Sequence, residues 1–274
     1  MQIVALREGW FGRLALKGTA TLAMVYILLP LVFVIWLSFF AQEIPSFPPD
    51  GYSLRWFFAI ADHKVFAQGF VLSLQVGCLA TVLGLVLGVP ASLVVVRYPF
   101  QGRNIASGLL LAPLIVPGVV LGTSLYVFQI ETEIATGYPM MGSFWGLVLA
   151  HTLIVIPWTM RLVTANLQGL DRSIEEAASN LGAPPFTTFY RVTLPMIRPG
   201  IVAAALFGFV NSFGNLEMSM FLVGPGRTTL PIAILQYLEW KIDPTVAAAS
   251  VLQIALIATA LLITDHYVKL SRVV

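Results

Sequence analysis

The feature that most constrains this chain is a set of long stretches that contain no Lys, Arg, Asp or Glu. They run from Thr19 to Ala41, Val65 to Val96, Asn104 to Ile130, Ile134 to Met160, Pro199 to Leu216 and Pro244 to Thr264. A helix of roughly 20 residues crosses a hydrocarbon core of about 30 Å. Each stretch is long enough to do so, and the sequence therefore predicts membrane-spanning helices.

The composition excludes the main soluble classes. Charged residues make up 10% of the 274 residues and hydrophobic residues 58%, whereas soluble domains carry roughly 25% charge. So little charge could not cover a soluble enzyme or keep a chain disordered. A nucleic-acid partner is also excluded, because it would need a dense basic stripe. We therefore expect the chain to be embedded in a lipid bilayer.

We expect an all-α polytopic membrane protein with six transmembrane helices, forming one transmembrane domain over residues 1–274. The predicted spans are about 19–41, 70–96, 104–130, 143–160, 200–222 and 245–264, with a polar loop over 161–199. The first span follows Arg7, Arg13 and Lys17 and lacks a small-residue cleavage site, so we interpret it as a retained signal-anchor helix.

The basic residues predict the orientation. With the N-terminus inside, eleven of the 15 basic residues fall on the cytoplasmic side, and only this orientation satisfies the positive-inside rule. The four left outside are Arg55, Lys64, Arg227 and Lys241. Both termini and the loop 161–199 are therefore predicted to be cytoplasmic.

Prolines and glycines inside the spans predict local irregularity and close packing. Pro113 and Pro117 lie one turn apart in LAPLIVPG, which favours a helix break with a gating role there. Single prolines in other spans are interpreted as ordinary kinks. Gly77, Gly84 and Gly88 predict a close helix contact.

The loop 161–199 predicts a helical hairpin. Ser173 and Glu176 have the spacing of a capping box, and Gly182 is suited to the left-handed residue that ends a helix. A second helix is expected to start at Pro184-Pro185 and to end at Leu194-Pro195. The apolar face of the first helix is formed by Ile174, Ala177, Ala178 and Leu181, and such a face is suited to lie in a groove of another protein.

The run EAASNLGAPPFTTFYRVTLP over residues 176–195 resembles the EAA loop of the permease subunits of ATP-binding-cassette importers. The positions that match the family pattern at its spacing are Glu176, Ala177, Ala178, Gly182, Leu194 and Pro195, with Val192 where Ile is usual. The segments YSLRWF, RYPFQGR, APLIVPG and GPGRTTLP are similar to permeases of the spermidine and putrescine branch.

This resemblance implies the type I importer permease fold in a bacterial inner membrane. It also implies the partners: two cytoplasmic ATPase subunits, a second permease subunit that is usually a homologue, and an external solute-binding protein. The chain has no Gly-Lys dipeptide and thus no P-loop. We therefore expect no enzymatic activity and no cofactor in this chain, with ATP and magnesium bound by the partner ATPases.

In the family interpretation, residues 176–181 form the coupling helix that docks on the ATPase, with Leu181 on its apolar face. Glu176 is interpreted either as part of that contact or as the capping partner of Ser173. Gly182 would allow the sharp turn that follows.

The candidate solute path is carried by Glu217, Asn215, Asn211 and His151. An intramembrane carboxylate is costly and is a functional candidate by default. However, Glu217 lies 19 residues beyond Arg198, or about 28 Å along a helix, so it could equally be an outer-end carboxylate. His151 is interpreted as a path residue or as a helix-packing residue. The three histidines, His63, His151 and His266, lack ligand spacing, and no metal site is expected.

The predicted function is import of a small amine-containing, polyamine-like solute, driven by ATP and coupled through the EAA loop. Within this interpretation, an amino-acid derivative, an opine or an aminophosphonate is an alternative solute. A secondary transporter driven by an ion gradient is the alternative class, although it predicts internal repeats and midplane ionisable residues that the sequence does not show clearly.

Overall fold

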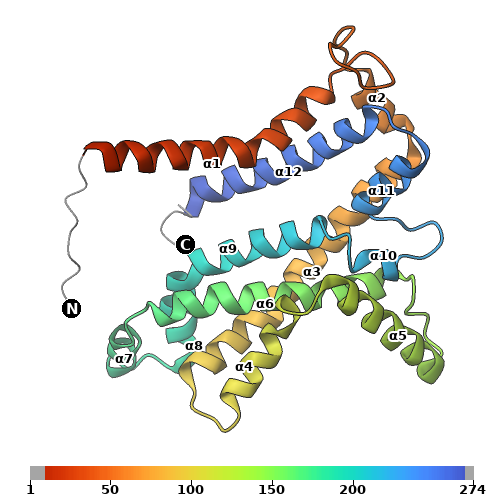
Figure 1. Cartoon of the computed structure of the whole chain (residues 1–274). Coiled ribbons are helices and arrows are strands. Elements are labelled where there is room, and N and C mark those ends of the chain that lie inside the picture. Colours follow the sequence, from red (N-terminus) through yellow and green to blue (C-terminus); the bar gives the residue numbers. More distant parts are fainter. Residues whose placement is uncertain (1–9, 269–274) are drawn as a thin grey trace. The chain divides into compact units, whose positions relative to one another are not determined.

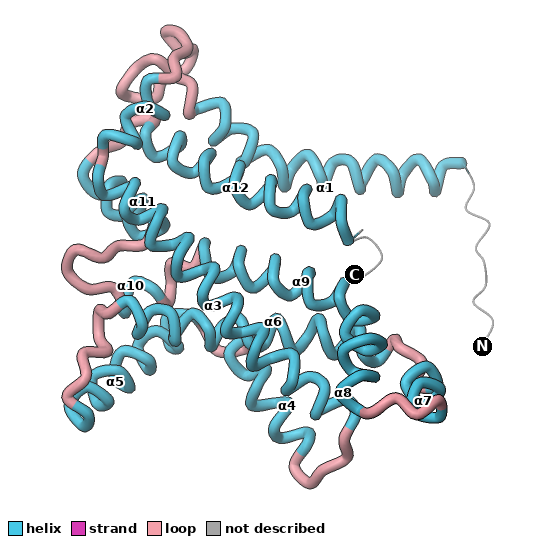
Figure 2. The backbone as a smooth tube through the Cα atoms, turned by 180° about the vertical axis from the view of Figure 1, so that it is seen from behind, coloured by secondary structure: helices cyan, strands magenta, loops and turns pink. Residues whose placement is uncertain are grey.

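The computed structural model describes residues 10–268 of the chain, and within them every regular element is a helix (Figures 1 and 2). In chain order these are α1 (Trp10–Leu37), α2 (Arg55–Asp62), α3 (Lys64–Arg97), α4 (Arg103–Leu111), the 3-10 helix η1 (Ala112–Leu114), α5 (Gly118–Thr136), α6 (Phe144–Gln168), α7 (Ser173–Asn180), α8 (Pro185–Thr188), the π-helical turn η2 (Phe189–Thr193), α9 (Leu194–Phe213), α10 (Ser219–Leu222), α11 (Leu230–Trp240) and α12 (Thr245–Val268). The all-α prediction is confirmed.

Among the described residues, five helices are long and apolar enough to cross a membrane, or up to six if one bent pair counts as a single span. The five lie at Gly12–Leu37, Lys64–Arg97, Phe144–Gln168, Pro185–Phe213 and Thr245–Asp265. The protein is therefore a polytopic membrane protein.

The chain divides into two compact units. Of the described residues, unit 1 contains 10–62 and 237–253, and unit 2 contains 63–236 and 254–268. All of the candidate site residues named above belong to unit 2.

The centre of unit 2 is the packing of α3, α6 and α9 against one another. Glycines allow these helices to approach closely. A Cβ atom at Gly84 would overlap Val155 of α6, and one at Gly88 would lie 2.7 Å from Cβ of Thr159. On α9, a Cβ atom at Gly208 would lie 2.7 Å from Cγ1 of Val155. The predicted close contact at the glycines of α3 is therefore confirmed. Its partner is α6 at Gly84 and Gly88, whereas a Cβ atom at Gly77 would lie 3.1 Å from the Phe209 ring of α9.

The predicted third span, 104–130, is not one straight helix. The segments Arg103–Leu114 and Gly118–Thr136 meet at an angle of 104°. The interruption lies at Pro113 and Pro117, where the break was predicted. Each proline lacks a backbone donor and sterically opposes continuation of the preceding helix. Single prolines elsewhere leave their helices continuous, with Pro90 inside α3 and Pro157 inside α6.

The expected helix end at Leu194-Pro195 is wrong, because the helix runs on without a stop from Pro185 to Phe213. Pro195 is accommodated by the π-helical turn that precedes it. A proline ring clashes with the carbonyl four residues earlier, which here is that of Arg191 within η2. The turn widens there, and the N–H of Leu194 bonds to the carbonyl of Phe189 instead.

The predicted fifth span, 200–222, also differs, because α9 begins at Leu194 and ends at Phe213. Gly214 and Asn215 follow that end. Gly disfavours helix, and an Asn side chain competes for backbone groups. Here Oδ1 of Asn215 accepts the N–H groups of Met218 and Ser219 at 3.2 and 3.3 Å, which starts the short helix α10 in a new direction.

In unit 1, two tryptophans organise the segment after α1. Nε1 of Trp36 donates to the hydroxyl of Tyr52 at 3.2 Å, and Nε1 of Trp56 donates to the carbonyl of Phe40 at 2.6 Å. The side chain of His266 lies outside the described residues.

The α3–α6 contact predicts different effects on stability for two glycine-to-alanine substitutions. Gly88→Ala should lower the stability of the protein by about 1–3 kcal/mol, as overpacking does, because the new methyl meets Thr159. Gly108→Ala on α4 has nothing within 4 Å of the new methyl and should be neutral or stabilising by up to about 1 kcal/mol. Melting temperatures of the purified variants in detergent test this, and equal melting temperatures would contradict the close contact.

Candidate functional site

The polar loop of unit 2 begins with an Asx turn in front of α7. Oδ1 of Asp171 accepts the backbone N–H of Ser173 at 2.9 Å, and this hydrogen bond, together with one from the Ser173 hydroxyl, lowers the pKa of Asp171. The predicted capping box is wrong: Ser173 is already inside the helix, and Glu176 pairs loosely with Arg172 at 3.8 Å. The ionised Asp171 is the better acceptor and displaces Ser173 from that role.

The end of α7 is a Schellman motif. The N–H of Ala183 bonds to the carbonyl of Ala178 at 3.1 Å, and the N–H of Gly182 bonds to that of Ser179 at 2.9 Å. Gly182 has φ of +87°, as predicted for the residue that ends this helix. A Cβ atom there would meet nothing within 4 Å, so backbone conformation alone requires the glycine.

The hairpin exposes a patch of apolar side chains, which we call the loop patch. It consists of Ile174, Leu181, Phe186 and Tyr190, whose exposed fractions are 43%, 89%, 78% and 62%. The rings of Phe186 and Tyr190 are stacked with centroids 6.4 Å apart. Ala177 is also exposed, Ala178 and Leu194 are half-buried, and Pro195 is exposed. Exposed apolar side chains gathered in this way outside the long apolar helices are typical of an interaction surface.

Glu175 is the residue of this loop that sequence reasoning missed. Its carboxylate forms an ion pair with Arg97, with 3.2 Å between Oε2 and Nε, and accepts a hydrogen bond from Thr193 Oγ1 at 2.8 Å. A signal was present, because Arg97 ends the charge-free second stretch and Glu175 is the acidic neighbour of the motif glutamate. Spacing along the chain could not pair residues 78 positions apart.

A second group of polar residues lies where two helix breaks meet. A cavity of about 240 Å³ is lined by Asn211 and Asn215, by Pro113 and Gly118 from the other break, and by Trp158. Glu217 is exposed, and its carboxylate contacts the position that a Cβ atom of Gly118 would take. The carboxylate therefore lies at the N-terminus of α5, where the helix dipole favours negative charge.

Trp158 is an aromatic component of this cavity that the sequence reasoning did not include. Its ring stacks on Phe207 of α9, with centroids 5.5 Å apart and an angle of 16° between the planes.

His151 does not line this cavity. It is 1% exposed, with Nδ1 at 2.7 Å from the hydroxyl of Ser212 and Nε2 at 3.1 Å from that of Ser219. In a neutral imidazole one nitrogen donates and the other accepts, so both are satisfied. His151 joins α6 to the ends of the break between α9 and α10.

Metal binding has no candidate in the described part of the chain, where no group of three or more His, Cys, Asp or Glu side chains is arranged to hold an ion. The polar and aromatic side chains that line the cavity are those of Asn211, Asn215 and Trp158, and the Glu217 carboxylate lies beside its Gly118 wall.

The profile of one protein family, described as "Binding-protein-dependent transport system inner membrane component", matches residues 80–272. The putrescine transport system permease PotI of Escherichia coli K12 is 31% identical over 232 residues, which cover 84% of this chain and 82% of PotI. The putative 2-aminoethylphosphonate permease PhnV of Salmonella typhimurium is 30% identical, with 96% and 95% covered. The spermidine/putrescine permease PotC of E. coli K12 is 26% identical, with 89% and 90% covered.

Solved structures show a similar fold. A chain of a bacterial transporter that imports the acidic polysaccharide alginate has a TM-score of 0.71 at 14% identity and covers 97% of this chain and 99% of its own. A chain of the inward-facing MetNI methionine transporter has a TM-score of 0.63 at 20% identity, with 76% and 97% covered.

The position of His151 predicts a structural effect of its removal. His151→Leu should lower stability by about 1–3 kcal/mol, because the hydroxyl of Ser212 loses its partner in a buried site. Thr123→Val is the control, since Thr123 is exposed and bonds within its own helix. Thermal unfolding in detergent measures both variants. Unchanged stability with lost transport would instead make His151 a path residue.

Proposed function

The chain belongs to the family of binding-protein-dependent transport system inner membrane components, and from this premise we propose that it forms half of the pathway of an ATP-driven importer for a small solute that carries a primary amine. The other half is a second permease subunit, a homologue of this chain. The relatives of this chain named above give no support to the alternative, a secondary transporter. The chain is a transport subunit. Two partner ATPase subunits bind ATP and Mg²⁺ and hydrolyse the ATP.

The loop patch is the proposed docking surface for an ATPase subunit. Apolar side chains that no part of the described chain covers, on a short helix with a rigid C-terminal turn, suit a groove on a partner. Closure of the ATPase on ATP moves α7, and this changes the relative free energies of the inward-facing and outward-facing states. Glu176, Ala177, Ala178, Leu181, Gly182, Leu194 and Pro195 are the positions that we assign to this contact or to its support.

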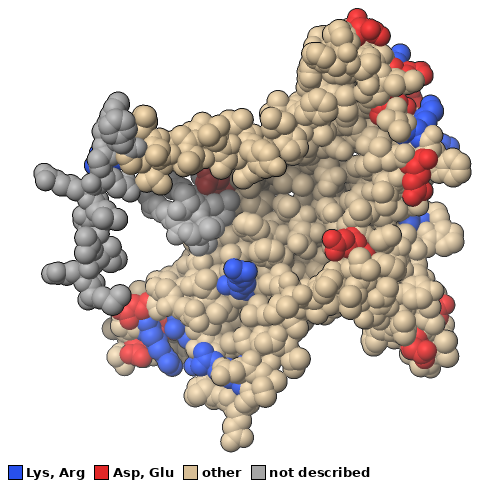
Figure 3. Space-filling model, in the orientation of Figure 1, with Lys and Arg blue, Asp and Glu red and all other residues tan. Residues whose placement is uncertain are grey.

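The loop patch faces the cytoplasm in this proposal. On the face shown in Figure 3, basic side chains gather at the end of unit 2 that carries α7, and the positive-inside rule assigns such an end to the cytoplasm. With this orientation both termini are cytoplasmic. The chain lies in a bacterial inner membrane, and an external solute-binding protein docks on the opposite side. A solved structure of the bacterial alginate transporter is a complex of this kind, with a periplasmic protein that holds an alginate pentasaccharide.

The solute class rests on one observation, the exposed carboxylate of Glu217 between two helix breaks. Discontinuous helices at membrane depth are a common construction for solute sites in transporters. Glu217 offers a counter-ion to an ammonium group, Asn211 and Asn215 line the adjoining cavity, and the Trp158 ring supplies a face for a cation.

The relatives support the same class. Putrescine, spermidine and 2-aminoethylphosphonate, which stand in the names of PotI, PotC and PhnV, share one chemical feature, a primary amine that is protonated at neutral pH. One carboxylate beside amides suits a solute with one or two such amines. Putrescine-like diamines are the first choice, and aminophosphonates and amino-acid derivatives follow.

Coupling through the loop predicts a specific effect of a side chain at Gly182. Gly182→Val in the complex with its ATPase should distort the end of α7, since a left-handed conformation costs a branched residue about 1–3 kcal/mol. Stimulation of ATP hydrolysis by the solute-binding protein should then fall several-fold. Gly102→Val is the matched control, because Gly102 also has positive φ and open space, but lies in another hairpin. Equal stimulation in both variants would contradict the assignment of the coupling loop.

The solute site predicts that Glu217→Gln reduces uptake of the transported amine. Loss of a charge-assisted hydrogen bond of about 1.5–3 kcal/mol corresponds to roughly a ten- to hundredfold rise in the solute concentration needed. Labelled putrescine, spermidine and 2-aminoethylphosphonate are the probes, in proteoliposomes that hold the assembled complex. Glu239→Gln, an exposed carboxylate on α11 that does not line the cavity, is the control. Uptake that is unchanged by Glu217→Gln removes Glu217 from the path.

A further inference from the structure

The helix α7 is not held in place by a hydrophobic core. It has eight residues, none of which is buried. Beside it lies a cavity of about 530 Å³, lined by Leu93 and Val94 of α3, Ser179 of α7, and Thr188 and Phe189 of the following segment. The apolar surface of α3 therefore does not hold α7 by close packing. Beside the contacts of α7 with α8 and η2, a polar interaction at this cavity links α7 to α3.

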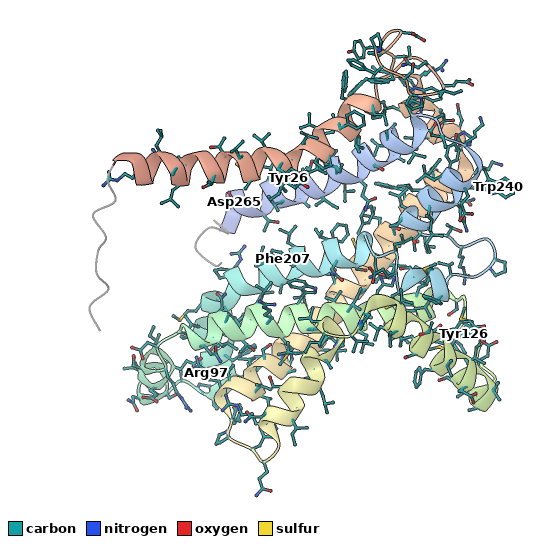
Figure 4. The ribbon with its side chains drawn as sticks, in the orientation of Figure 1. Tyr26, Arg97, Tyr126, Phe207, Trp240 and Asp265 are labelled. Carbon is teal, nitrogen blue, oxygen red and sulfur yellow. The ribbon has the colours of Figure 1, made fainter. Side chains whose placement is uncertain are left out.

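That interaction is the carboxylate of Glu175, which bridges three elements. Oε2 lies 3.2 Å from Nε of Arg97, the last residue of α3, and Nη2 of Arg97 donates to Oε1 at 3.3 Å. Oε1 also accepts the hydroxyl of Thr193, 4% exposed, from the π-helical turn before α9 at 2.8 Å. Arg97 is seen in Figure 4 at the end of α3, near α8.

The ion pair of Glu175 with Arg97 is more buried than the neighbouring pair of Glu176 with Arg172. The side chains of Arg97 and Glu175 are 15% and 19% exposed, whereas those of Arg172 and Glu176 are 64% and 68% exposed at 3.8 Å. An exposed ion pair contributes little. Removing one partner of a largely buried pair leaves an uncompensated charge and is strongly unfavourable.

The two helices bound by Glu175 are parts of the central packing of unit 2. α3 packs against α6 at Gly84 and Gly88, and α9 packs against α6 at Gly208. The other end of α9 carries Asn211 beside the candidate solute cavity, about 27 Å from Thr193 along a helix. A displacement of α7 that reaches Thr193 therefore reaches α9, which carries Asn211 of the cavity. One that reaches Arg97 reaches α3, which packs against α6, the helix that carries Trp158 of the cavity.

We propose that Glu175, rather than the motif residue Glu176, passes the movement of α7 to α3 and α9, by means of its ion pair with Arg97 and its hydrogen bond from Thr193. This inference rests on the proposed function, because it assumes that an ATPase moves α7. Glu175 is a positioning residue: it lies behind the docking surface and touches neither the partner nor the solute.

The test reports on the conformation of the pathway and does not depend on which solute is carried. The complex with its ATPase and second permease is assembled in nanodiscs with Cys78→Ser and Asn211→Cys in this chain. The rate at which a maleimide labels residue 211 is measured with and without ATP, Mg²⁺ and vanadate, and ATP hydrolysis is measured in parallel.

We expect Glu175→Gln to retain ATP hydrolysis while the ATP-dependent change in labelling falls about five- to tenfold, at the lower end of typical coupling energies. Glu131→Gln, an exposed carboxylate on α5, should leave the change intact. Combining Arg97→Glu with Glu175→Arg should restore it, which a general defect in folding would not allow. If Glu175→Gln does not assemble, Thr193→Val gives the same test with about a two- to threefold loss, since it removes one neutral hydrogen bond.

The outcomes separate the two proposals. No ATP-dependent change in the chain with native Glu175 would overturn the proposed function and this inference with it. A change that is present there and equally large in Glu175→Gln or Thr193→Val would leave the proposed function standing and overturn the role of Glu175.

Discussion

The close approach of α3 and α6 is the contact on which unit 2 depends. In a bilayer, apolar side chains gain little by leaving lipid for protein, so helix association relies on packing and on small residues that let backbones approach. Gly84 and Gly88 create this contact, since Val155 and Thr159 occupy the space that larger side chains would need. Because α9 packs on the same face of α6 through Gly208, three helices form one body to which the irregular parts of the unit are attached.

Those irregular parts carry the candidate chemistry. Backbone that leaves the helical conformation at membrane depth must find partners for its polar groups, and here side chains supply them. Asn215 takes the first N–H groups before α10, and His151 with Ser212 and Ser219 occupies the adjoining interior. The same break leaves Glu217 exposed at the start of α5. Residues that stabilise the break and residues that are free to meet a solute are therefore neighbours in sequence but differ in burial.

Much of this could be predicted from the sequence because it is encoded locally. Long charge-free stretches predict spans, Pro113 and Pro117 predict a break, and Gly182 predicts a left-handed helix end. The predictions that were wrong depended on competition between neighbouring residues, and the contacts that were missed join residues far apart along the chain. Ser173 has the spacing of a cap, but Asp171 is a stronger acceptor two residues earlier. Pro195 normally stops a helix, yet a wider turn accommodates it. The pairing of Glu175 with Arg97, like the place of Trp158 in the cavity, requires knowing which helices pack together.

The π-helical turn at Phe189–Thr193 has a consequence for how one helix can serve two surroundings. An α-helix has a fixed angular relation between residues at its two ends, so a face chosen for one contact determines the face at the other. The N–H of Leu194 bonds five residues back, and this wider turn changes the rotational phase between the two sides of it. Phe186 and Tyr190 can thus be aimed at water or a partner while Ile197, Gly200 and Ala204 are aimed into the protein interior. The π-helical turn therefore rotates the side chains before it relative to those after it, without interrupting the helix. Each end of the helix can then present a different face to its own surroundings.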